Sequence, residues 1–389
     1  MNYRKLGQSS LMVSEIGLGC EHLQGLDAGS VKAVIDQALA SGLNIMDVFM
    51  SEPAVRSNIG AALKGRRNQV VLQGHIGSVW LDGQYTRSRN LAQCREAFED
   101  LLTRLQTDYI DIGMIHFVDT EDDYQRVFAT NILPYALELK KTGKIKHLGF
   151  SSHNPVTALK IVKTGLFDVL MFSVNPAYDI LPEDTAIDDF FVSESYQNDQ
   201  LKGINPAREM LYRTCEAMGT AITVMKGLAA GSLLKAESSP FGAALTPVQC
   251  IHYALTRPAV ASILVGCRTP QEVIQAAAYE EASETERDYS PVLSRTPKYS
   301  LNGKCMYCNH CLPCPSKIDI AQVNKYLDLV LAVRSENSTA PVPGTIREHY
   351  AALSSAAADC IACGSCESNC PFGVPVIERM RQAQAVFGK

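Results

Sequence analysis

Eight short apolar runs, separated by amphipathic helical patterns, occupy the chain between about residue 14 and residue 278. In order, the runs are SEIGLGC, NIMDVF, QVVLQGHI, YIDIGMIHF, KHLGFSS, VLMFSV, AITVMK and SILVGC. Strands that are apolar throughout and alternate with helices predict a parallel sheet that is covered on both faces. Two of the helical patterns are SVKAVIDQALASG, which Gly42 closes as a C-cap, and QCREAFEDLLTRL.

Eight strands and eight helices close naturally into a (β/α)8 barrel, the TIM barrel, which is an α/β fold. An open, doubly wound sheet is the alternative, and it favours a glycine-rich first turn with G-x-G-x-x-G spacing. The corresponding segment, GLGCEHLQG, has glycines without that spacing. The sequence therefore predicts the barrel.

Polar residues recur where the predicted strands end, which is the face of a TIM barrel that carries the chemistry. Three of these residues, Asp47, His75 and His116, are titratable, and three titratable groups at one rim are typical of a site. The less specific interpretation is that chains turn polar wherever strands end. The full set of strand-end residues is Cys20, Asp47, His75, His116, Ser151, Ser152, His153, Val174, Asn175, Lys226, Gly266, Cys267, Arg268 and Thr269.

Eight of the thirteen cysteines lie in two tight runs near the C-terminus. Cys305, Cys308, Cys311 and Cys314 follow a C-x2-C-x2-C-x2-C-P pattern, and Cys360, Cys363, Cys366 and Cys370 follow C-x2-C-x2-C-x3-C-P. The second pattern is the bacterial ferredoxin run, in which the fourth cysteine serves the other cluster. We therefore expect two [4Fe–4S] clusters, one held by Cys305, Cys308, Cys311 and Cys370 and the other by Cys360, Cys363, Cys366 and Cys314. Two zinc sites are the competing interpretation.

Composition and charge narrow the class of protein. The apolar share of 46% and charged share of 20% are those of a globular protein, and a net charge of -5 without basic clusters argues against nucleic-acid binding. The polar start MNYRKLGQSS and the absence of eighteen consecutive apolar residues give no sign of secretion or of membrane association. We expect a cytoplasmic protein, in an anaerobic or low-oxygen cell, whose other cysteines are buried thiols: Cys20, Cys94, Cys215, Cys250 and Cys267.

Several of these segments also resemble the aldo-keto reductases. The likeness rests on YRKLGQSSLMVSEIGLG, ALASGLNIMD, DYIDIGMIH, KTGKIKHLGFSS and ILVGCRTPQEV, and it covers roughly residues 3 to 278 in consistent order. It implies a TIM barrel that transfers hydride between NADPH and a carbonyl. Asp47 and His116 match the aspartate and histidine of the family's catalytic group, whereas Glu52 stands at the tyrosine position and His75 at the lysine position.

The two changed positions are those that make the family's proton donor. Carbonyl reduction needs an acid near the developing alkoxide, so Glu52, His75 and His116 form the expected proton-handling set, with Asp47 orienting one of them. His153 is a further candidate because it directly follows the fifth predicted strand. The alternative for Glu52 is a carboxylate that only stabilises a helix N-terminus.

The cofactor positions implied by the resemblance also depart from the family pattern. Met171 and Val174 stand where the family has a glutamine and a nicotinamide-stacking aromatic residue, and Gln275 and Ala276 replace the pair that grips the adenine end. NAD(P)H and FMN are therefore the candidate cofactors of the barrel, and the sequence does not decide between them. The candidate cofactor contacts are Ser151, Ser152, Asn175, Lys226, Gly266, Arg268 and Thr269.

The whole chain resembles the iron–sulfur subgroup of aldo-keto reductase-like proteins. We expect a barrel domain at residues 1–285 and a smaller ferredoxin-like iron–sulfur domain at residues 286–389, with RDYSPVLSR as the hinge and DILPEDTAIDDFFVSESYQNDQLKGINP as a lid or a surface insertion. The favoured function is an oxidoreductase acting on a small organic substrate, of carbonyl or hydroxyl type, with electrons passed through the clusters. Ferredoxin or another electron carrier would be its partner. The alternatives are an electron-transfer protein whose barrel is a docking scaffold, and a non-redox lyase or isomerase with structural clusters.

Overall fold

The computed structural model of the chain describes residues 1–198, 201–296, 303–336 and 338–389. Backbone packing divides these residues into two compact units. The first comprises residues 1–174, 220–227 and 260–280, and the second comprises residues 175–219, 228–259 and 281–389. Because the second unit includes segments from within the predicted barrel domain, the domain boundary at residues 285 and 286 stays a prediction.

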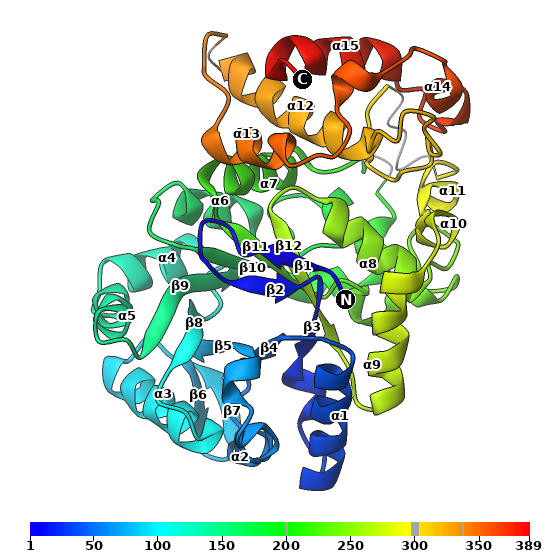
Figure 1. The fold of residues 1–389 in the computed structure, drawn as a ribbon. Helices are drawn as coiled ribbons and strands as arrows, with labels where there is room; N and C mark the ends of the chain where they lie inside the picture. The colour runs from blue at the N-terminus through cyan, green and yellow to red at the C-terminus, as the bar shows by residue number, and fades with distance from the viewer. Residues whose placement is uncertain (199–200, 297–302, 337) are drawn as a thin grey trace. The chain divides into compact units, whose positions relative to one another are not determined.

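The first unit holds a closed barrel of eight parallel strands (Figure 1). Each strand overlaps one of the eight apolar runs of the sequence, so the predicted barrel is confirmed and the open sheet is excluded. Around the barrel the strand order is β10, β11, β12, β3, β4, β5, β8 and β9. The strand bounds are β3 (Ile16–Gly19), β4 (Ile45–Val48), β5 (Val71–Ile76), β8 (Ile110–Ile115), β9 (Ile145–Ser152), β10 (Val169–Ser173), β11 (Ala221–Met225) and β12 (Val260–Gly266).

The register of neighbouring strands brings the polar strand ends together. Asp47 pairs with Gln73 across β4 and β5, and His75 pairs with Met114 across β5 and β8. Because all the strands are parallel, their carboxyl ends meet at one rim. Below that rim the barrel is filled by buried apolar side chains, which include Ile45, Ile112, Met114, Val169 and Met171.

Two antiparallel hairpins and seven α-helices complete the first unit among its described residues. One hairpin pairs β1 (Tyr3–Lys5) with β2 (Met12–Ser14), and the other, which directly follows β5, pairs β6 (Ser78–Leu81) with β7 (Gln84–Arg87). The helices are α1 (Ala28–Ala40), α2 (Pro53–Leu63), α3 (Leu91–Leu105), α4 (Glu121–Phe128), α5 (Ile132–Lys141), α6 (Pro155–Val162) and α9 (Pro270–Ala277).

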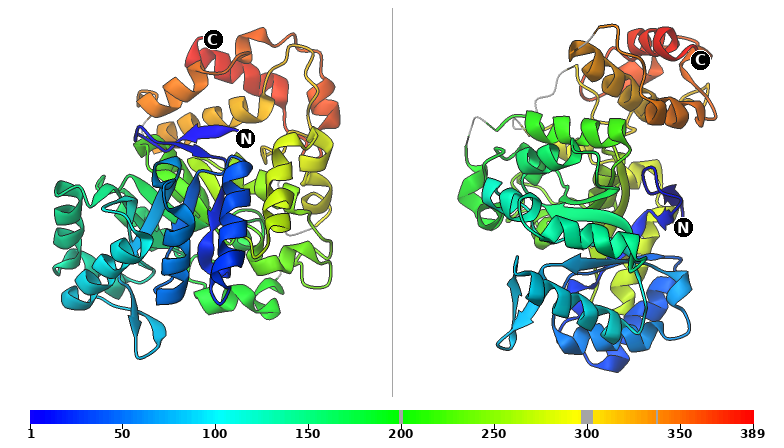
Figure 2. Two further views of the ribbon diagram at one scale, coloured as in Figure 1. Left: turned by 60° about the horizontal axis from the view of Figure 1, so that its bottom comes forward. Right: turned by 90° about the vertical axis from the view of Figure 1, so that its left-hand side faces the viewer.

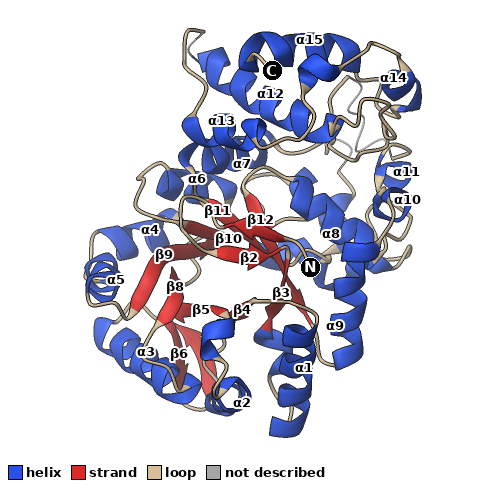
Figure 3. Cartoon of the chain, in the orientation of Figure 1, coloured by secondary structure: helices blue, strands red, loops and turns tan. Residues whose placement is uncertain are grey.

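The described part of the second unit is made of helices and loops (Figure 3). Within it, α12 packs against α15, and the two lie side by side in both views of Figure 2. The segment expected as a hinge is packed, because Tyr289 and Leu293 are buried and Tyr289 donates a hydrogen bond to the carbonyl of Met306. The helices are α7 (Pro206–Met218), α8 (Pro247–Thr256), α10 (Glu284–Arg287), α11 (Ser290–Leu293), α12 (Ile320–Glu336), α13 (Gly344–Ala351), α14 (Ser365–Asn369) and α15 (Val376–Phe387).

The described part of the segment expected as a lid or insertion, which excludes residues 199–200, has 3-10 turns at Ile187–Phe191 and Ser193–Tyr196, and a third, Tyr178–Ile180, spans its start. Its start is fixed by the fully buried carboxylate of Asp179, which accepts hydrogen bonds from the hydroxyls of Tyr212 and Tyr253. Arg208 lies 3.2 Å from the same carboxylate. This end of the segment is therefore anchored within the second unit, and its role as a lid stays a prediction.

Helices α7 and α13 of the second unit are joined by a buried carboxylate. Glu216 on α7 accepts a hydrogen bond from His349 Nδ1 on α13 at 2.6 Å and another from the backbone N–H of Ala259 at 2.6 Å. Burial alone would raise the pKa of Glu216, but the bond from His349 and the charge of Lys325 lower it overall. The ionised carboxylate therefore stabilises this helix contact.

Replacing Glu216 by glutamine tests that contact. We expect amide hydrogen exchange of residues 344–351 to become about tenfold faster, because a hydrogen bond to a charged group contributes about 1.5 kcal/mol or more. Glu209→Gln on the same helix is the matched control, since Glu209 forms a partly exposed ion pair with Arg213. Equal exchange in the Glu216 variant and the wild type would contradict the assignment.

Two features of the structure bear on the expectations from composition. The five cysteines outside the C-terminal runs are all buried and unpaired, as predicted. Among the described residues, no helix combines the length and apolar character that crossing a bilayer requires.

Candidate functional site

The barrel rim joins three of the predicted residues in one hydrogen-bonded chain. Asp47 Oδ1 lies 2.9 Å from His75 Nε2, and His75 Nδ1 lies 2.9 Å from His116 Nδ1. Asp47 Oδ1 also accepts a hydrogen bond from Gln73 Nε2 at 3.0 Å. All four side chains are buried. The ends of β4, β5 and β8 therefore assemble a chain that links a carboxylate to two imidazoles.

A tyrosine that the sequence analysis did not single out extends this chain. The hydroxyl of Tyr85, on β7, lies 2.6 Å from His116 Nε2. Burial raises the pKa of Tyr85, although nearby Arg87 opposes the shift. Burial, together with the charges of His75 and Arg89, lowers the pKa of His116 well below its usual value. At neutral pH, Tyr85 is therefore a protonated phenol beside a neutral imidazole.

An aromatic side chain packs against three members of the chain. The ring of Phe49 stacks on His116 at 5.6 Å between centroids and meets the rings of His75 and Tyr85 edge-on at 6.0 Å. Such packing fixes the ring planes of the two histidines and excludes water from one side. The hydrogen bonds between the rings are thereby held in line.

Glu52 and His153, the other two predicted catalytic residues, are placed differently. Glu52 is the N-cap residue of α2, makes no side-chain capping bond and has one buried carboxylate oxygen without a hydrogen-bond partner. His153 Nδ1 lies 2.9 Å from Asp119 Oδ2. Burial opposes ionisation of Asp119, but its bonds from His153 lower its pKa overall. The described hydrogen bonds thus connect neither residue to Asp47, His75 or His116, and their catalytic roles stay predictions.

Two of the candidate cofactor contacts hold the loop after β8. Ser151 Oγ accepts a hydrogen bond from the backbone N–H of Phe117, and Ser152 Oγ donates one to Asp119. Asn175, a third candidate, accepts from the N–H of Tyr178 in the second unit and so caps a turn there. These bonds give the three side chains a structural role, and their roles as cofactor contacts stay predictions.

Among the candidate cofactor contacts, Gly266, Arg268 and Thr269 follow one another at the end of β12, and the backbone amides of Arg268 and Thr269 are occupied. The carboxylate of Glu272 accepts hydrogen bonds from the N–H of Arg268 at 2.5 Å and of Thr269 at 3.3 Å, as part of the capping box of α9. A carboxylate in this place repels a phosphate and leaves it fewer donors. The arrangement as it stands does not fit a phosphate at these amides. Lys226, at the end of β11, is partly exposed.

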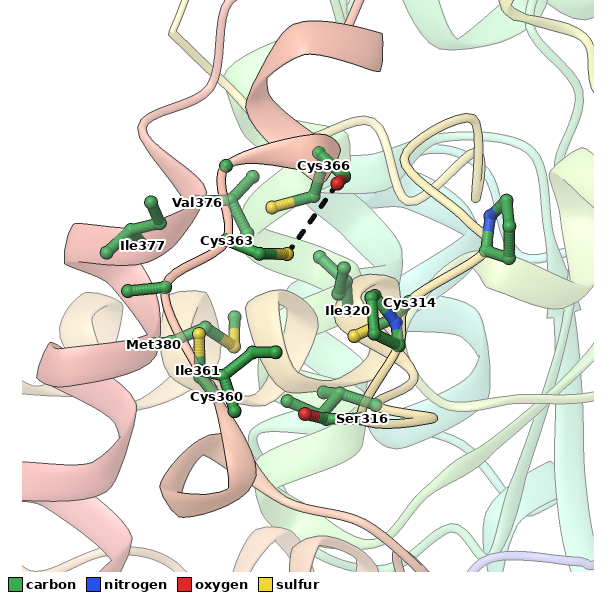
Figure 4. A pocket seen from close by; sticks show the side chains of 16 residues that line it. Cys314, Ser316, Ile320, Cys360, Ile361, Cys363, Cys366, Val376, Ile377 and Met380 are labelled. Atoms are coloured by element: carbon green, nitrogen blue, oxygen red, sulfur yellow. Dashed lines mark hydrogen bonds between the residues drawn. The ribbon is translucent and has the colours of Figure 1, made fainter.

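The eight C-terminal cysteines line two cavities of the second unit, four to each. Figure 4 shows the first cavity, where Cys360, Cys363 and Cys366 come from one segment and Cys314 from another. The second cavity is lined by Cys305, Cys308 and Cys311 from one segment and by Cys370 from the other. Each cavity thus takes three cysteines from one run and the last cysteine of the other run. Ile320 and Val376 line both cavities and form a shared apolar wall.

The two cavities suit a cluster of several atoms. They open to solvent, and about 380 Å³ and about 330 Å³ of space free of protein atoms, open solvent included, lie between their lining residues. Among the described residues, no group of three or more His, Cys, Asp or Glu side chains stands close enough to bind a single metal ion. Four thiols around a space of this size, with apolar walls, match the donor set and surroundings of a [4Fe–4S] cluster.

The two cavities differ in exposure. Burial raises the pKa of Cys308 in the second cavity to about 11. In the first cavity, Cys363 is exposed, and its hydrogen bonds with Ser365 lower the pKa of its thiol. The neighbouring Ile361 is 66% exposed.

Sequence analysis missed Tyr85, Gln73 and Phe49, and a signal for the first was present. The pair Asp82-Gly83 stands between SVWL and QYTR, and such a pair between two strand-like runs is a strong hairpin signal. Both residues have positive φ, 51° and 78°, as a two-residue hairpin turn requires. A hairpin directly after β5 places its residues at the rim, so Tyr85 could have been predicted as a rim residue from the sequence.

Comparison with known proteins gives two matches to sequence families. The aldo/keto reductase family matches residues 15–249, and the 4Fe-4S dicluster domain matches residues 304–375, which include all eight cysteines of the two cavities. The first match spans more than half of the chain. The second confirms the kind of domain expected at the C-terminus.

Individual relatives agree with this assignment. The uncharacterized oxidoreductase YqkF of Bacillus subtilis is 29% identical over 300 residues, which are 74% of this chain and 94% of YqkF. The aldo-keto reductase YhdN of the same organism is 30% identical over 161 residues, 39% of this chain and 47% of YhdN. Among solved structures, aldo-keto reductase AKR11C1 of Bacillus halodurans in its holo form has a TM-score of 0.57 at 24% identity, covering 74% of this chain and 94% of that one, and thus shares the fold.

Proposed function

The chain belongs to the aldo/keto reductase family and carries a C-terminal 4Fe-4S dicluster domain, and we propose that this oxidoreductase interconverts a carbonyl and an alcohol of a small organic substrate at the barrel rim, with electrons passed through two [4Fe–4S] clusters. Two cavities with four cysteines each carry this proposal. Cys305, Cys308, Cys311 and Cys370 would hold one cluster, and Cys314, Cys360, Cys363 and Cys366 the other. When bound, the clusters supply one-electron transfers.

Reduction of a carbonyl takes up two electrons, which the two clusters would supply, and two protons, one at the oxygen and one at the carbon, and alcohol oxidation releases them. The rim residues would carry the proton at the oxygen, and solvent water would exchange the proton at the carbon. In alcohol oxidation, His116 would take a proton at Nε2 and pass the one on its Nδ1 to His75, which would pass its own from Nε2 to Asp47. The distances of 2.9 Å between neighbours allow each transfer without movement of a side chain.

We assign no step to a nicotinamide cofactor. Glu272 occupies the backbone amides of Arg268 and Thr269, two of the candidate cofactor contacts, and Val174 stands where the family has a stacking aromatic residue. The electron source would instead be a carrier protein such as a ferredoxin that meets the exposed cluster site. A cytoplasm low in oxygen would suit both clusters and the free thiols.

Anaerobic spectroscopy of the full-length, cluster-loaded chain tests the proposal. The clusters are first reduced with a limiting amount of dithionite, and a panel of small aldehydes, ketones and the matching alcohols is then added, beginning with 4-nitrobenzaldehyde. We expect a substrate carbonyl to restore the visible cluster absorbance while about one alcohol forms per two electrons. Reoxidation without product would favour a plain electron-transfer protein. Turnover without any electron donor would favour a lyase or isomerase.

A further inference from the structure

We propose that Tyr85 is the catalytic residue that exchanges the hydroxyl proton of the substrate, as the outer end of a relay that runs through His116 and His75 to Asp47. This inference rests on the proposed function, because the relay serves the same carbonyl and alcohol chemistry. It places the acid on the β6–β7 hairpin rather than at residue 52.

The geometry singles out Tyr85 among the four relay residues. Its hydroxyl lies 2.6 Å from His116 Nε2, and its residue is 39% exposed, whereas Asp47, His75 and His116 are buried. A substrate can therefore contact the Tyr85 side chain, whereas the two imidazoles are buried. The ring of Tyr85 meets Phe49 edge-on, and the hairpin register places Tyr85 opposite Trp80.

The relay has two proton arrangements that differ by one proton on Asp47. With Asp47 ionised, His75 carries its proton on Nε2 and donates to Asp47, while His116 carries its proton on Nδ1 and donates to His75. Tyr85 then donates to His116 Nε2. We assign this arrangement to the resting chain because Asp47 Oδ1 also accepts a bond from Gln73, which suits a carboxylate.

In alcohol oxidation, the phenol oxygen accepts the substrate's hydroxyl proton as its own proton passes to His116 Nε2. His116 releases its Nδ1 proton to His75 Nδ1, and His75 releases its Nε2 proton to Asp47. The O–H bond of the substrate is broken and one is formed on Asp47, and each histidine stays neutral with its tautomer reversed. The carbon-bound hydrogen leaves as a proton to solvent water, and the two electrons of that C–H bond pass to the two clusters, one to each. In carbonyl reduction the same proton returns from Asp47 to the substrate oxygen.

Glu52 is the competing acid, because it stands at the position where the family carries its tyrosine. The described hydrogen bonds do not connect it to the relay, and one of its oxygens is buried without a partner. Tyr85, by contrast, is protonated at neutral pH and contacts a histidine that burial keeps neutral and able to accept. The two candidates therefore predict different variants to fail.

Three conservative variants of the cluster-loaded chain decide between them. Tyr85→Phe removes only the hydroxyl, and Glu52→Gln removes the competing acid. Tyr109→Phe is the control, because Tyr109 precedes β8, whereas His116 of the relay follows the other end of that strand. With the substrate found in the panel above, we expect Tyr85→Phe to lose about 10²- to 10⁴-fold in turnover, since that is the typical contribution of a positioned acid or base. Tyr109→Phe should stay within a few-fold of the wild type, and Tyr85→Phe should lose at least tenfold more turnover than Glu52→Gln.

Turnover lost in Glu52→Gln but kept in Tyr85→Phe would overturn the inference while leaving the proposed function intact. A wild type that converts neither carbonyl nor alcohol would instead overturn the proposed function. Imidazole ¹⁵N NMR at neutral pH gives a readout that needs no substrate, with His116→Gln and His75→Gln used to assign the signals. We expect His116 as the Nδ1–H tautomer, and shifted His116 signals in Tyr85→Phe. His116 signals that are identical in both chains would overturn the relay.

Discussion

A chain with Cys314 and Cys366 both replaced by alanine is expected to keep one intact [4Fe–4S] cluster, whereas a chain with Cys311 and Cys314 replaced is expected to keep none. The reason is the crossed arrangement of the two cavities. Cys314 and Cys366 line the same cavity, so their loss should spare the other one. Cys311 and Cys314 are close in sequence but line different cavities, so each cluster should lose a ligand.

Iron and sulfide analysis, together with the electron paramagnetic resonance spectrum of the reduced chain, measures this difference. The wild type should hold about eight irons and the Cys314/Cys366 variant about four. Cys250→Ala is the matched control, because Cys250 is a buried thiol outside both cavities and should leave about eight irons. Clusters held by consecutive cysteines would give the reverse result, with one intact cluster in the Cys311/Cys314 variant. Bound zinc in place of iron would refute the cluster assignment altogether.

The barrel could be predicted because short-range sequence patterns, the apolar runs and the helical patterns between them, determine it. Eight apolar runs between helices leave few ways to bury both faces of a sheet, and parallel strands carry their ends to one rim. The meeting of Asp47, His75 and His116 follows from strand order alone. The cysteine sets were predictable for a similar reason, since the spacing of each run determines which three sulfurs face the same cavity.

The hydrogen-bond chain could not be predicted to the same depth. Which ring nitrogen of His75 faces Asp47, and which faces His116, depends on side-chain rotamers fixed by neighbours such as Phe49 and Gln73, and strand order does not specify these. Tyr85 was missed for another reason, because a hairpin was overlooked where an Asp-Gly pair signals one. The bonds from the Arg268 and Thr269 amides to Glu272 could also have been predicted, because the spacing of Thr269 and Glu272 is that of a capping box.

Replacing His116 by glutamine should interrupt proton movement in the middle of the relay. Glutamine keeps a polar group of similar size, but its amide cannot accept a proton on one side and release another from the opposite side, as an imidazole does. We expect turnover of the cluster-linked reaction to fall by about 10²- to 10⁴-fold. Cluster reduction by dithionite should be unchanged, because it requires no residue of the rim. His147→Gln is a matched control, since His147 is a partly exposed histidine that lies 3.7 Å from Asp168.

The pKa of His116 also sets a direction for the effect of pH on stability. Burial and the nearby charges of His75, Arg89, His153 and Arg87 lower it well below 6.5 in the folded chain. Between pH 6.5 and that lowered pKa, the unfolded chain binds a proton at this position that the folded chain does not. This residue should therefore reduce the free energy of unfolding by about 1.4 kcal/mol for each pH unit below 6.5, and have no effect of this kind above pH 6.5.

Thermal unfolding of the wild type and His116→Gln, compared from pH 8 to pH 5, measures this contribution. The glutamine does not titrate, so the stability advantage of the wild type should be constant above pH 6.5 and should shrink as the pH falls below it. The same neutral imidazole should keep the relay working below pH 6.5, so wild-type turnover should continue at pH values at which an ordinary histidine is already protonated. An advantage that grows on acidification would mean that His116 is stabilised as a cation, and a cation at this position could not accept the proton of Tyr85.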